Sequence, residues 1–237
     1  MFGDADNIPS IERDAFMEIT LDWNDAGVAL ATWNDGDNRL NPDSMGRLHD
    51  ILDEVSAHEG PTAFVLTGTG KFFSNGLDLD RFANAPEELD ITFRSLHRFM
   101  GRILALPTYT ICAINGHAFA GGAMISGVFD YKVMREDRGF WCLNEIDIKV
   151  PVSGPMTAGL SAQIPTSTLA EAMLTGRRFS GPEALDAGIV HQLADEDGVL
   201  IAALERAAEM ATKDRDTMGL HKKHLFGAAA KLLADNS

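Results

Sequence analysis

Cysteine, basic residues and long apolar runs are all scarce in this chain of 237 residues. The 2 cysteines, Cys112 and Cys142, lie in apolar company without metal-ligand spacing. They predict reduced core residues of a cytoplasmic protein and exclude a disulfide framework. The 20 Lys and Arg residues against 35 Asp and Glu residues give a net charge of −15, which argues against nucleic acid and anionic membranes as partners. No apolar run approaches the roughly 20 residues of a membrane span.

Targeting and metal-binding patterns are missing as well. The acidic start of the chain, MFGDADNIPSIERD, resembles neither a signal peptide nor an arginine-rich transit peptide. Among the 7 histidines only His221 and His224 have ligand spacing, and the lysines between them favour an exposed helix face. We therefore expect no metal site.

What is present is an ordinary globular balance, with 45% apolar and 23% charged residues. Strand-like apolar runs alternate with helical spacings through the first two-thirds of the chain, and helical spacings alone follow. This order predicts an α/β core over 13–195 and a C-terminal α-helical extension over 196–237 that mediates oligomerisation. The expected strands cover 16–21, 27–33, 63–67, 111–114 and 131–134, the expected helices cover 45–58, 87–105, 167–174, 198–212 and 217–234, and residues 1–12 form a loose arm.

The stretch 110–145 concentrates the residues with chemical potential. A turn at Asn115-Gly116-His117 follows a strand-like run, and Gly121 and Gly122 stand where a helix could begin. A glycine-lined helix start offers free backbone N–H groups to an anion. The stretch ends in Glu145, whose pKa an apolar setting would raise. On this stretch alone, the alternatives are favoured, namely close helix packing of the glycines and a solvated Glu145.

A second stretch supplies another backbone donor. Gly76 forms a turn before a helical segment that starts near Leu79, which leaves the N–H group of Leu77 at a helix start. Two donors from separate loops are what an oxyanion hole requires. An ordinary strand-to-helix turn capped by Asp78 is the alternative. The nearby GTGK, residues 68–71, lacks the glycine spacing of a phosphate-binding P-loop and excludes that reading.

Four segments in order resemble the signature regions of the crotonase superfamily, the enoyl-CoA hydratase/isomerase fold. They are NRLNPDSM (38–45), LTGTGKFFSNGLDL (66–79), NGHAFAGGAMISGVFDYKVM (115–134) and LTGRRFSGPEALDAGIV (174–190), and the resemblance covers about 16–230. It implies a spiral of ββα units with C-terminal helices that form a homotrimer or a dimer of trimers. It also implies an acyl-CoA thioester substrate, no separate cofactor, and an oxyanion hole made by the N–H groups of Leu77 and Gly121.

The catalytic positions of the family point to one activity within it. Typical hydratases of the family carry one Glu at the position of Met124 and a second at the position of Glu145. A methionine cannot transfer a proton, so the resemblance implies a monofunctional Δ3,Δ2-enoyl-CoA isomerase in which Glu145 alone moves a proton from C2 to C4. SNGLDL, GHAFAGG, YKVMREDRGF and NEIDI also resemble such isomerases. The alternatives are a hydratase or other crotonase-type enzyme that recruits Asp147, and a non-catalytic acyl-CoA binder.

The substrate contacts that the resemblance implies come from several segments. Arg39 is expected beside the nucleotide and pantetheine, and Asp80 stands where many relatives carry a lysine. Lys222 or Lys223 is therefore a candidate for the CoA phosphates, with a solvated helix face as the alternative. The remaining expected substrate-binding residues are Leu40, Ser74, Asn75, Gly76, Asp78, Gly122, Met124, Leu143 and Asn144.

Overall fold

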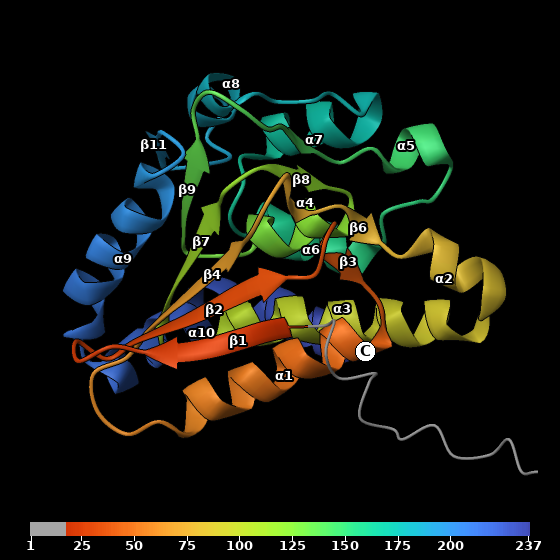
Figure 1. Cartoon of the computed structure of the whole chain (residues 1–237). Helices are drawn as coiled ribbons and strands as arrows, with labels where there is room; N and C mark the ends of the chain where they lie inside the picture. The colour runs from red at the N-terminus through yellow and green to blue at the C-terminus, as the bar shows by residue number, and fades with distance from the viewer. Residues whose placement is uncertain (1–17) are drawn as a thin grey trace, which may run out of the picture.

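A computed structural model describes residues 18–237 as an α/β fold (Figure 1). The expected loose arm at 1–12, the proposed core boundary at residue 13 and the start of the first expected strand lie outside the described residues. The main sheet has 6 strands in the order β1-β2-β4-β7-β9-β11. Their bounds are β1 Glu18–Trp23, β2 Val28–Asn34, β4 Ala63–Gly68, β7 Tyr109–Ile114, β9 Tyr131–Arg135 and β11 Gln192–Ala194. β1 pairs antiparallel with β2, and every other neighbouring pair is parallel.

Two smaller sheets lie beside the main one. The first has the order β10-β8-β5 and consists of Trp141–Cys142, His117–Phe119 and Phe72–Ser74. The second pairs β3, Arg39–Leu40, with β6, Gly76–Leu77. These short strands carry the chain from the end of the main sheet to the segments that the sequence marks as chemically important.

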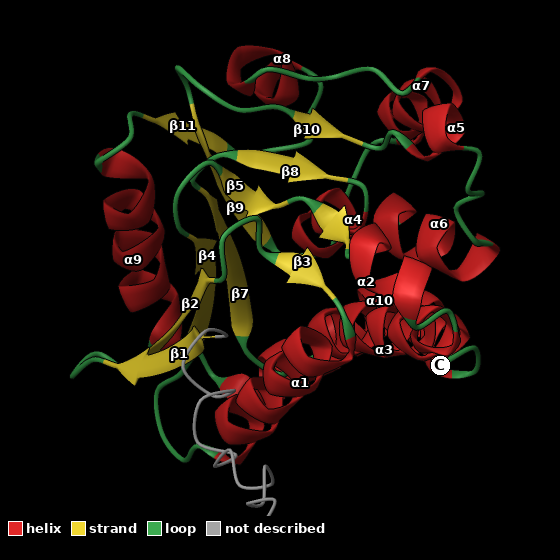
Figure 2. Cartoon of the chain, turned by 45° about the vertical axis from the view of Figure 1, so that its right-hand side comes forward, coloured by secondary structure: helices red, strands yellow, loops and turns green. Residues whose placement is uncertain are grey.

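Helices cover both faces of the main sheet (Figure 2). They are α1 Pro42–Ala57, α2 Leu79–Asn84, α3 Glu87–Ala105, α4 Gly121–Gly127, α5 Glu145–Ile148, α6 Gly154–Ser161, α7 Thr166–Thr175, α8 Gly181–Asp186, α9 Gly198–Ala211 and α10 Arg215–Ala234. Ala63 and Val65 of β4 belong to the cluster packed against α9, whereas Phe64 and Leu66 belong to the larger core with α1 and α3. Burial on both faces is the reason that β4 reads as a continuous apolar run.

Local chemistry explains why α1 begins where it does. Asn41 Oδ1 accepts hydrogen bonds from the backbone N–H groups of Asp43 and Ser44 at 3.1 and 3.0 Å. Pro42 stands at the first helical position, where its missing N–H group costs no hydrogen bond. The helix therefore starts three residues before the first apolar position of the periodic pattern, Met45.

The C-terminal helices pack directly on the earlier elements. α9 lies on β4, β7 and β9, and α10 lies along α3, where Gly101 allows the close approach of Leu233. Lys222 of α10 is buried, and its Nζ donates to Asp130 Oδ2 at 2.7 Å. Lys222 is therefore neither a solvated helix residue nor available to CoA phosphates, and both expectations for this lysine were wrong. Lys223 is exposed, and its role at the CoA phosphates stays a prediction. The proposed boundary at 195/196 stays a prediction.

Candidate active site

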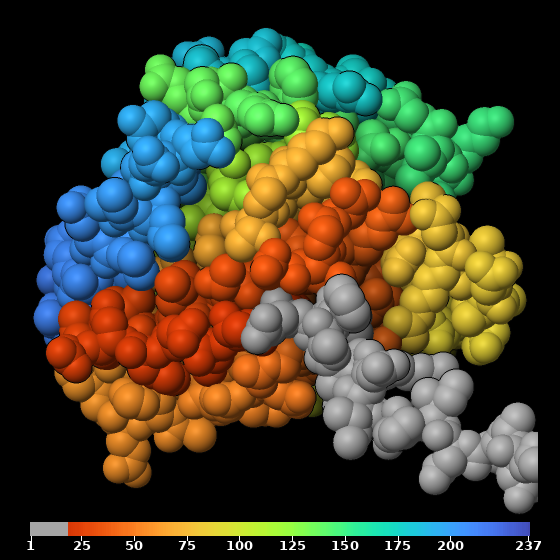
Figure 3. Space-filling view, viewed as in Figure 1, coloured from red at the N-terminus to blue at the C-terminus, as the bar shows by residue number. Residues whose placement is uncertain are grey.

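A cavity of about 320 Å³ lies where the small sheets meet α2, α3, α4 and α5. This volume falls at the lower end of the range of small-molecule sites in proteins, roughly 300–1,000 Å³. Figure 3 shows the outer side of this region, with α2 in yellow beside the α5 segment in green. The cavity is lined by Arg39, Asn75, Leu77, Leu79, Asp80, Phe93, Leu96, Phe119, Ala120, Gly121, Met124, Asn144, Glu145, Ile148, Val150, Pro151, Val152 and Met156.

The turns at Gly76 and Gly121 touch each other at one wall of the cavity. Gly76 has a φ of +79°, and a Cβ atom on it would lie 3.2 Å from the Gly121 nitrogen and 3.0 Å from the Phe119 oxygen. Gly121 is the first residue of α4, so its N–H group has no acceptor within the helix. A Cβ atom on Gly121 would overlap the side chain of Leu40. Gly76 is thus required by its positive φ and by close backbone approach, and Gly121 by the nearby Leu40 side chain. The Leu77 and Gly121 residues line the same cavity.

Ala120 holds an unusual backbone conformation between β8 and α4. Its φ is +50° and its ψ is −121°, a region that L-residues rarely adopt. The Ala120 N–H group donates to Cys142 O at 3.0 Å, and Ala120 O accepts from Met124 N at 3.0 Å. These contacts fix the peptide that carries the Gly121 N–H group. The sequence contained no signal for this feature, because alanine in a small-residue stretch indicates a helix.

Glu145 presents the only carboxyl group among the cavity-lining residues besides Asp80. It begins α5, its exposed fraction is 6%, and its Oε2 atom is buried without a hydrogen-bond partner. Burial raises its pKa from 4.5 to about 7, because desolvation disfavours the charged form. A carboxyl group with this pKa exchanges a proton readily near neutral pH.

The residues beside and opposite Glu145 differ in polarity. Met124 lines the cavity from α4, three residues past Gly121, with an exposed fraction of 3%. Asn144 lines it next to Glu145, and its Oδ1 atom is buried without a partner. Asp147, the reserve candidate for an acid, is exposed and does not line the cavity. Within residues 18–237 no group of three His, Cys, Asp or Glu side chains is arranged to hold a metal ion.

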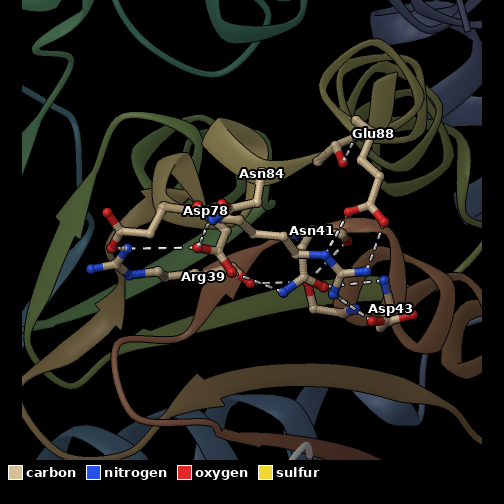
Figure 4. Close-up of polar contacts among 10 residues, drawn as sticks. Arg39, Asn41, Asp43, Asp78, Asn84 and Glu88 are labelled. Carbon is tan, nitrogen blue, oxygen red and sulfur yellow. Dashed lines mark hydrogen bonds and ion pairs between the residues drawn. The ribbon is translucent and has the colours of Figure 1, made fainter. Parts of the chain in front are cut away.

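Ion pairs connect Arg39 and Asp80, which both line the cavity, with acidic residues nearby (Figure 4). Arg39 Nη1 lies 2.7 Å from Asp80 Oδ2 and 3.7 Å from Asp78 Oδ1, and Nη2 lies 3.1 Å from Asp37 Oδ2. Asp37 also accepts a hydrogen bond from Asn75 Nδ2 at 3.2 Å. Arg39 lines the cavity as expected, but carboxylates on two sides already occupy its guanidinium group.

The neighbouring arginine follows the same pattern. Arg81 pairs with Asp43 of α1 and with Glu88 of α3, which Figure 4 shows beside Asn41. α2 is therefore held to α1 and α3 through its own cation. Neither Arg39 nor Arg81 is free of a carboxylate partner.

The structure divides the expected site residues into two groups. Those that line the cavity are Arg39, Asn75, Leu77, Gly121, Met124, Asn144 and Glu145, and those that lie behind its wall are Leu40, Ser74, Gly76, Asp78, Gly122 and Leu143. Ser74 Oγ donates to Asn38 O at 2.6 Å, and Asp78 accepts from Arg81 N at 3.2 Å as the cap of α2. These residues support the site without facing its interior.

The sequence reading missed part of the apolar wall. The additional lining residues are Phe93 and Leu96 of α3, and Ile148, Val150, Pro151, Val152 and Met156. Phe93 and Leu96 lie in the helix predicted over 87–105, and α3 confirms that helix. Their place in a ligand cavity had no separate signal, because helical spacing does not distinguish a core contact from a cavity wall.

The sequence pattern of the enoyl-CoA hydratase/isomerase family matches residues 24–236. The chain belongs to this family. It is 32% identical over 194 residues to the peroxisomal enoyl-CoA delta isomerase 2 of Arabidopsis thaliana, a match that covers 78% of this chain and 81% of the plant protein. It is also 32% identical over 216 residues to a putative enoyl-CoA hydratase of Thermus thermophilus, with coverage of 88% and 84%.

The fold has close counterparts among solved structures. The human mitochondrial delta3-delta2-enoyl-CoA isomerase superposes with a TM-score of 0.85 at 23% identity, covering 92% of this chain and 86% of the human one. The predicted crotonase-type fold with a C-terminal helical region is confirmed, as is membership in a family of enzymes. Among residues 18–237, no helix combines the length and apolar character needed to cross a bilayer.

Proposed function

We propose that this protein is a Δ3,Δ2-enoyl-CoA isomerase, which moves the double bond of a 3-enoyl-CoA to the 2-trans position. The observation that carries the proposal is one buried carboxyl group, Glu145, in a cavity whose position three residues past Gly121 holds Met124. Enoyl-CoA delta isomerases of Arabidopsis among the relatives support it. Acyl-CoA is the substrate in this proposal, and no separate cofactor takes part.

The reaction needs one proton acceptor that later becomes a donor. The ionised Glu145 carboxylate removes a proton from C2, and the C–H electron pair passes into a dienolate. The protonated carboxyl group then delivers the same proton to C4, which leaves the conjugated 2-enoyl thioester and the original carboxylate. A pKa of about 7 suits both steps, because neither form is strongly favoured near neutral pH.

Backbone N–H groups stabilise the dienolate oxygen in this mechanism. The donors are Leu77 and Gly121, whose loops meet at the close contact of Gly76 with Gly121. An oxyanion-hole donor is worth about 2.7–4 kcal/mol in other enzymes. The rare conformation of Ala120 orients the Gly121 peptide, and such strained residues cluster at sites where position matters.

Binding of the CoA portion requires a rearrangement of the ion pairs around Arg39. Arg39 is proposed to contact CoA phosphates, and its ion pair with Asp80 must break before it can do so. Breaking this pair costs little, because the Asp80 side chain is 87% exposed and exposed ion pairs contribute roughly 0–1 kcal/mol.

Hydration of 2-enoyl-CoA is the second candidate function, and the relative from Thermus thermophilus favours it. A hydratase of the usual type holds water between two carboxylates, whereas Met124 leaves Glu145 without such a partner. A non-catalytic binder is the third candidate. The raised pKa of the buried Glu145 carboxyl group supports proton transfer over this alternative.

Incubation with a 3-enoyl-CoA and, separately, with a 2-enoyl-CoA distinguishes the three candidates. We expect conversion of the first and negligible 3-hydroxyacyl-CoA from the second. A hydration rate equal to the isomerisation rate would favour the hydratase, and inertness toward both would favour the binder.

Met124→Glu sharpens the same test. The new carboxylate would stand one turn into α4 on the cavity wall, where a water molecule can bridge it to Glu145. We expect a small gain of hydration and a loss of isomerisation, both dependent on pH because two carboxyl groups in one cavity raise each other's pKa. Met124→Gln, which adds polarity without a titratable group, is the matched control.

Self-association through the helices after residue 196 is part of the proposal, as a homotrimer or a dimer of trimers. Large apolar side chains are exposed on α9 and α10, namely Ile201, Leu220, Leu225 and Leu232. Sedimentation at micromolar concentration tests this, and a stable monomer would contradict it. The cytoplasmic location stays a prediction.

A further inference from the structure

Two neighbouring side chains in the cavity wall carry buried oxygen atoms that have no hydrogen-bond partner. These atoms are Asn144 Oδ1 and Glu145 Oε2, and both residues line the same cavity. Folded proteins pair nearly all of their buried polar atoms, since an unpaired one loses its hydration without compensation. We therefore expect these two oxygen atoms to gain a hydrogen-bond donor during the reaction.

The surroundings limit what that partner can be. The walls contributed by α3, α4 and α6 are apolar, with Leu96, Met124 and Met156 facing the cavity. An amide oxygen and an ionised carboxylate are both acceptors, so the two side chains cannot pair through these atoms at rest. Once the carboxyl group takes up a proton it becomes a donor, and the neighbouring amide oxygen is then a suitable acceptor.

We propose that Asn144 is a positioning residue whose Oδ1 accepts a hydrogen bond from the Glu145 carboxyl group while that group carries the substrate proton. This inference rests on the proposed isomerase function. The C2–H bond breaks and an O–H bond forms on Glu145, with the electron pair left in the dienolate. The O–H bond then breaks as the C4–H bond forms, so atoms and charge balance without any further reactant.

The hydrogen bond acts in the interval between these two transfers. It holds the O–H group inside the cavity and away from water, so the proton removed from C2 is the one delivered to C4. Asparagine fits this role because its amide oxygen accepts a hydrogen bond but does not itself titrate near neutral pH. A carboxylate at the same position would compete for the proton.

Isotope transfer measures this directly. The full-length protein is given a 3-enoyl-CoA with deuterium at C2 in ordinary water, and the share of that deuterium found at C4 of the product is determined. We expect clear transfer by the unaltered protein. Asn144→Ala should lower the transferred share and reduce kcat by about tenfold, the loss expected for one hydrogen bond, with KM nearly unchanged.

Matched variants separate this role from a structural one. Asp147→Asn alters an exposed residue of the same short helix that does not line the cavity, and it should leave the transferred share and kcat unchanged. Asn144→Leu keeps the side-chain volume without an acceptor and replaces the alanine variant if that one does not fold. Asn144→Gln retains an amide and should recover part of the transfer.

Each outcome bears on one of the two claims. If the unaltered protein does not convert 3-enoyl-CoA, the proposed function itself is wrong. If it converts the substrate but transfers no deuterium, or transfers the same share with and without the Asn144 amide, the positioning role is overturned. A raised KM with unchanged kcat and transfer would also overturn it, because Asn144 would then bind the substrate instead.

Discussion

Buried ionisable groups have different partners in the active-site cavity and at the Lys222–Asp130 ion pair, which we call the anchor of α10. At the anchor, Lys222 Nζ donates to Asp130 Oδ2 at 2.7 Å, Ile103 O at 3.1 Å and Thr108 O at 3.4 Å. Asp130 Oδ2 also accepts from the N–H and hydroxyl groups of Thr110 at 2.9 and 2.8 Å. In the cavity, by contrast, Glu145 Oε2 has no partner.

Burial shifts both groups toward their neutral forms. It lowers the pKa of Lys222 and raises the pKa of Glu145 to about 7, since desolvation disfavours each charge. The anchor offsets this cost with a matched counter-ion and carbonyl oxygens. In the cavity no partner offsets the desolvation of the Glu145 carboxylate, so this group can exchange a proton with the substrate. The hydrogen-bond partners of a buried charge, more than its burial, separate a structural group from a reactive one.

Removal of the unpaired carboxyl group should have the largest effect. We expect Glu145→Gln to reduce isomerisation by on the order of 10²–10⁴-fold with acyl-CoA binding nearly intact, because general acid–base catalysis contributes factors of this size. Steady-state rates and a separate measurement of product binding check this. Retention of more than about a tenth of the rate would place the base elsewhere.

Disruption of the paired anchor should mainly affect stability. Lys222→Met leaves Asp130 buried without its counter-ion, and removal of one partner of a buried pair costs about 3–5 kcal/mol. Urea unfolding measures the loss.

The control for this variant lies on the same helix. Lys231 pairs with Asp235 in an (i, i+4) ion pair at 74% side-chain exposure, so Lys231→Met should cost about 0.5 kcal/mol or less. Equal losses for the two variants would contradict the view of Lys222 as an anchor.

The same cavity carboxyl group should make stability depend on pH. The folded state holds the Glu145 proton more tightly than the unfolded chain does, with a pKa of about 7 against 4.5. The stability that comes from this proton is complete below pH 4.5 and is lost as pH rises through about 7. At one pKa unit per 1.36 kcal/mol, the loss approaches roughly 3 kcal/mol.

Glu145→Gln removes that titration. Relative to the unaltered protein, the variant should gain stability at pH 8 and gain little at pH 5, as thermal unfolding at the two pH values will show. Asp147→Asn serves as the control, because Asp147 belongs to the same short helix but is exposed and does not line the cavity. An equal effect at both pH values would show that the Glu145 proton is not linked to folding.

Relief of backbone strain beside the cavity should give the smallest effect. Ala120 has a φ of +50°, which glycine adopts without the clash of a Cβ atom. Ala120→Gly should therefore stabilise the fold by up to about 1 kcal/mol, after the greater entropy of the unfolded glycine chain is counted. Ala123→Gly, inside α4, should instead destabilise by about 1 kcal/mol. Denaturant midpoints for both variants decide the sign.

Much of the fold and several site residues could be predicted from local patterns. The helix over 45–58, the buried strand over 63–67 and the long helices of the second half all match the structure to within a few residues. The Gly121 helix start and Glu145 both proved to line one cavity. Turn chemistry and periodicity predict these features because they act over a few residues.

Other features depend on contacts between distant segments. The sequence around Lys222 and Lys223 allowed a solvated helix face. In the structure Lys222 is buried and pairs with Asp130, which lies 92 positions away in the chain. Arg39 was expected beside the nucleotide and pantetheine of the substrate, and the sequence did not indicate that Asp80 of α2 pairs with it. Residue order alone does not specify such pairs, because complementary charges occur in many places along an acidic chain.

The family, most strands of the main sheet, the long helices and the candidate base follow from residue types at fixed spacings, whereas the edge strand β11, which lies in the part of the chain predicted to be helical alone, was missed. Only the folded structure shows that Asn144 and Glu145 have unpaired buried oxygens at one cavity, and that Ala120 has a positive φ of +50°. Burial and backbone strain arise only when segments far apart in the chain pack together. Desolvation depends on all of the surrounding atoms, and it is desolvation that brings the pKa of Glu145 close to neutral.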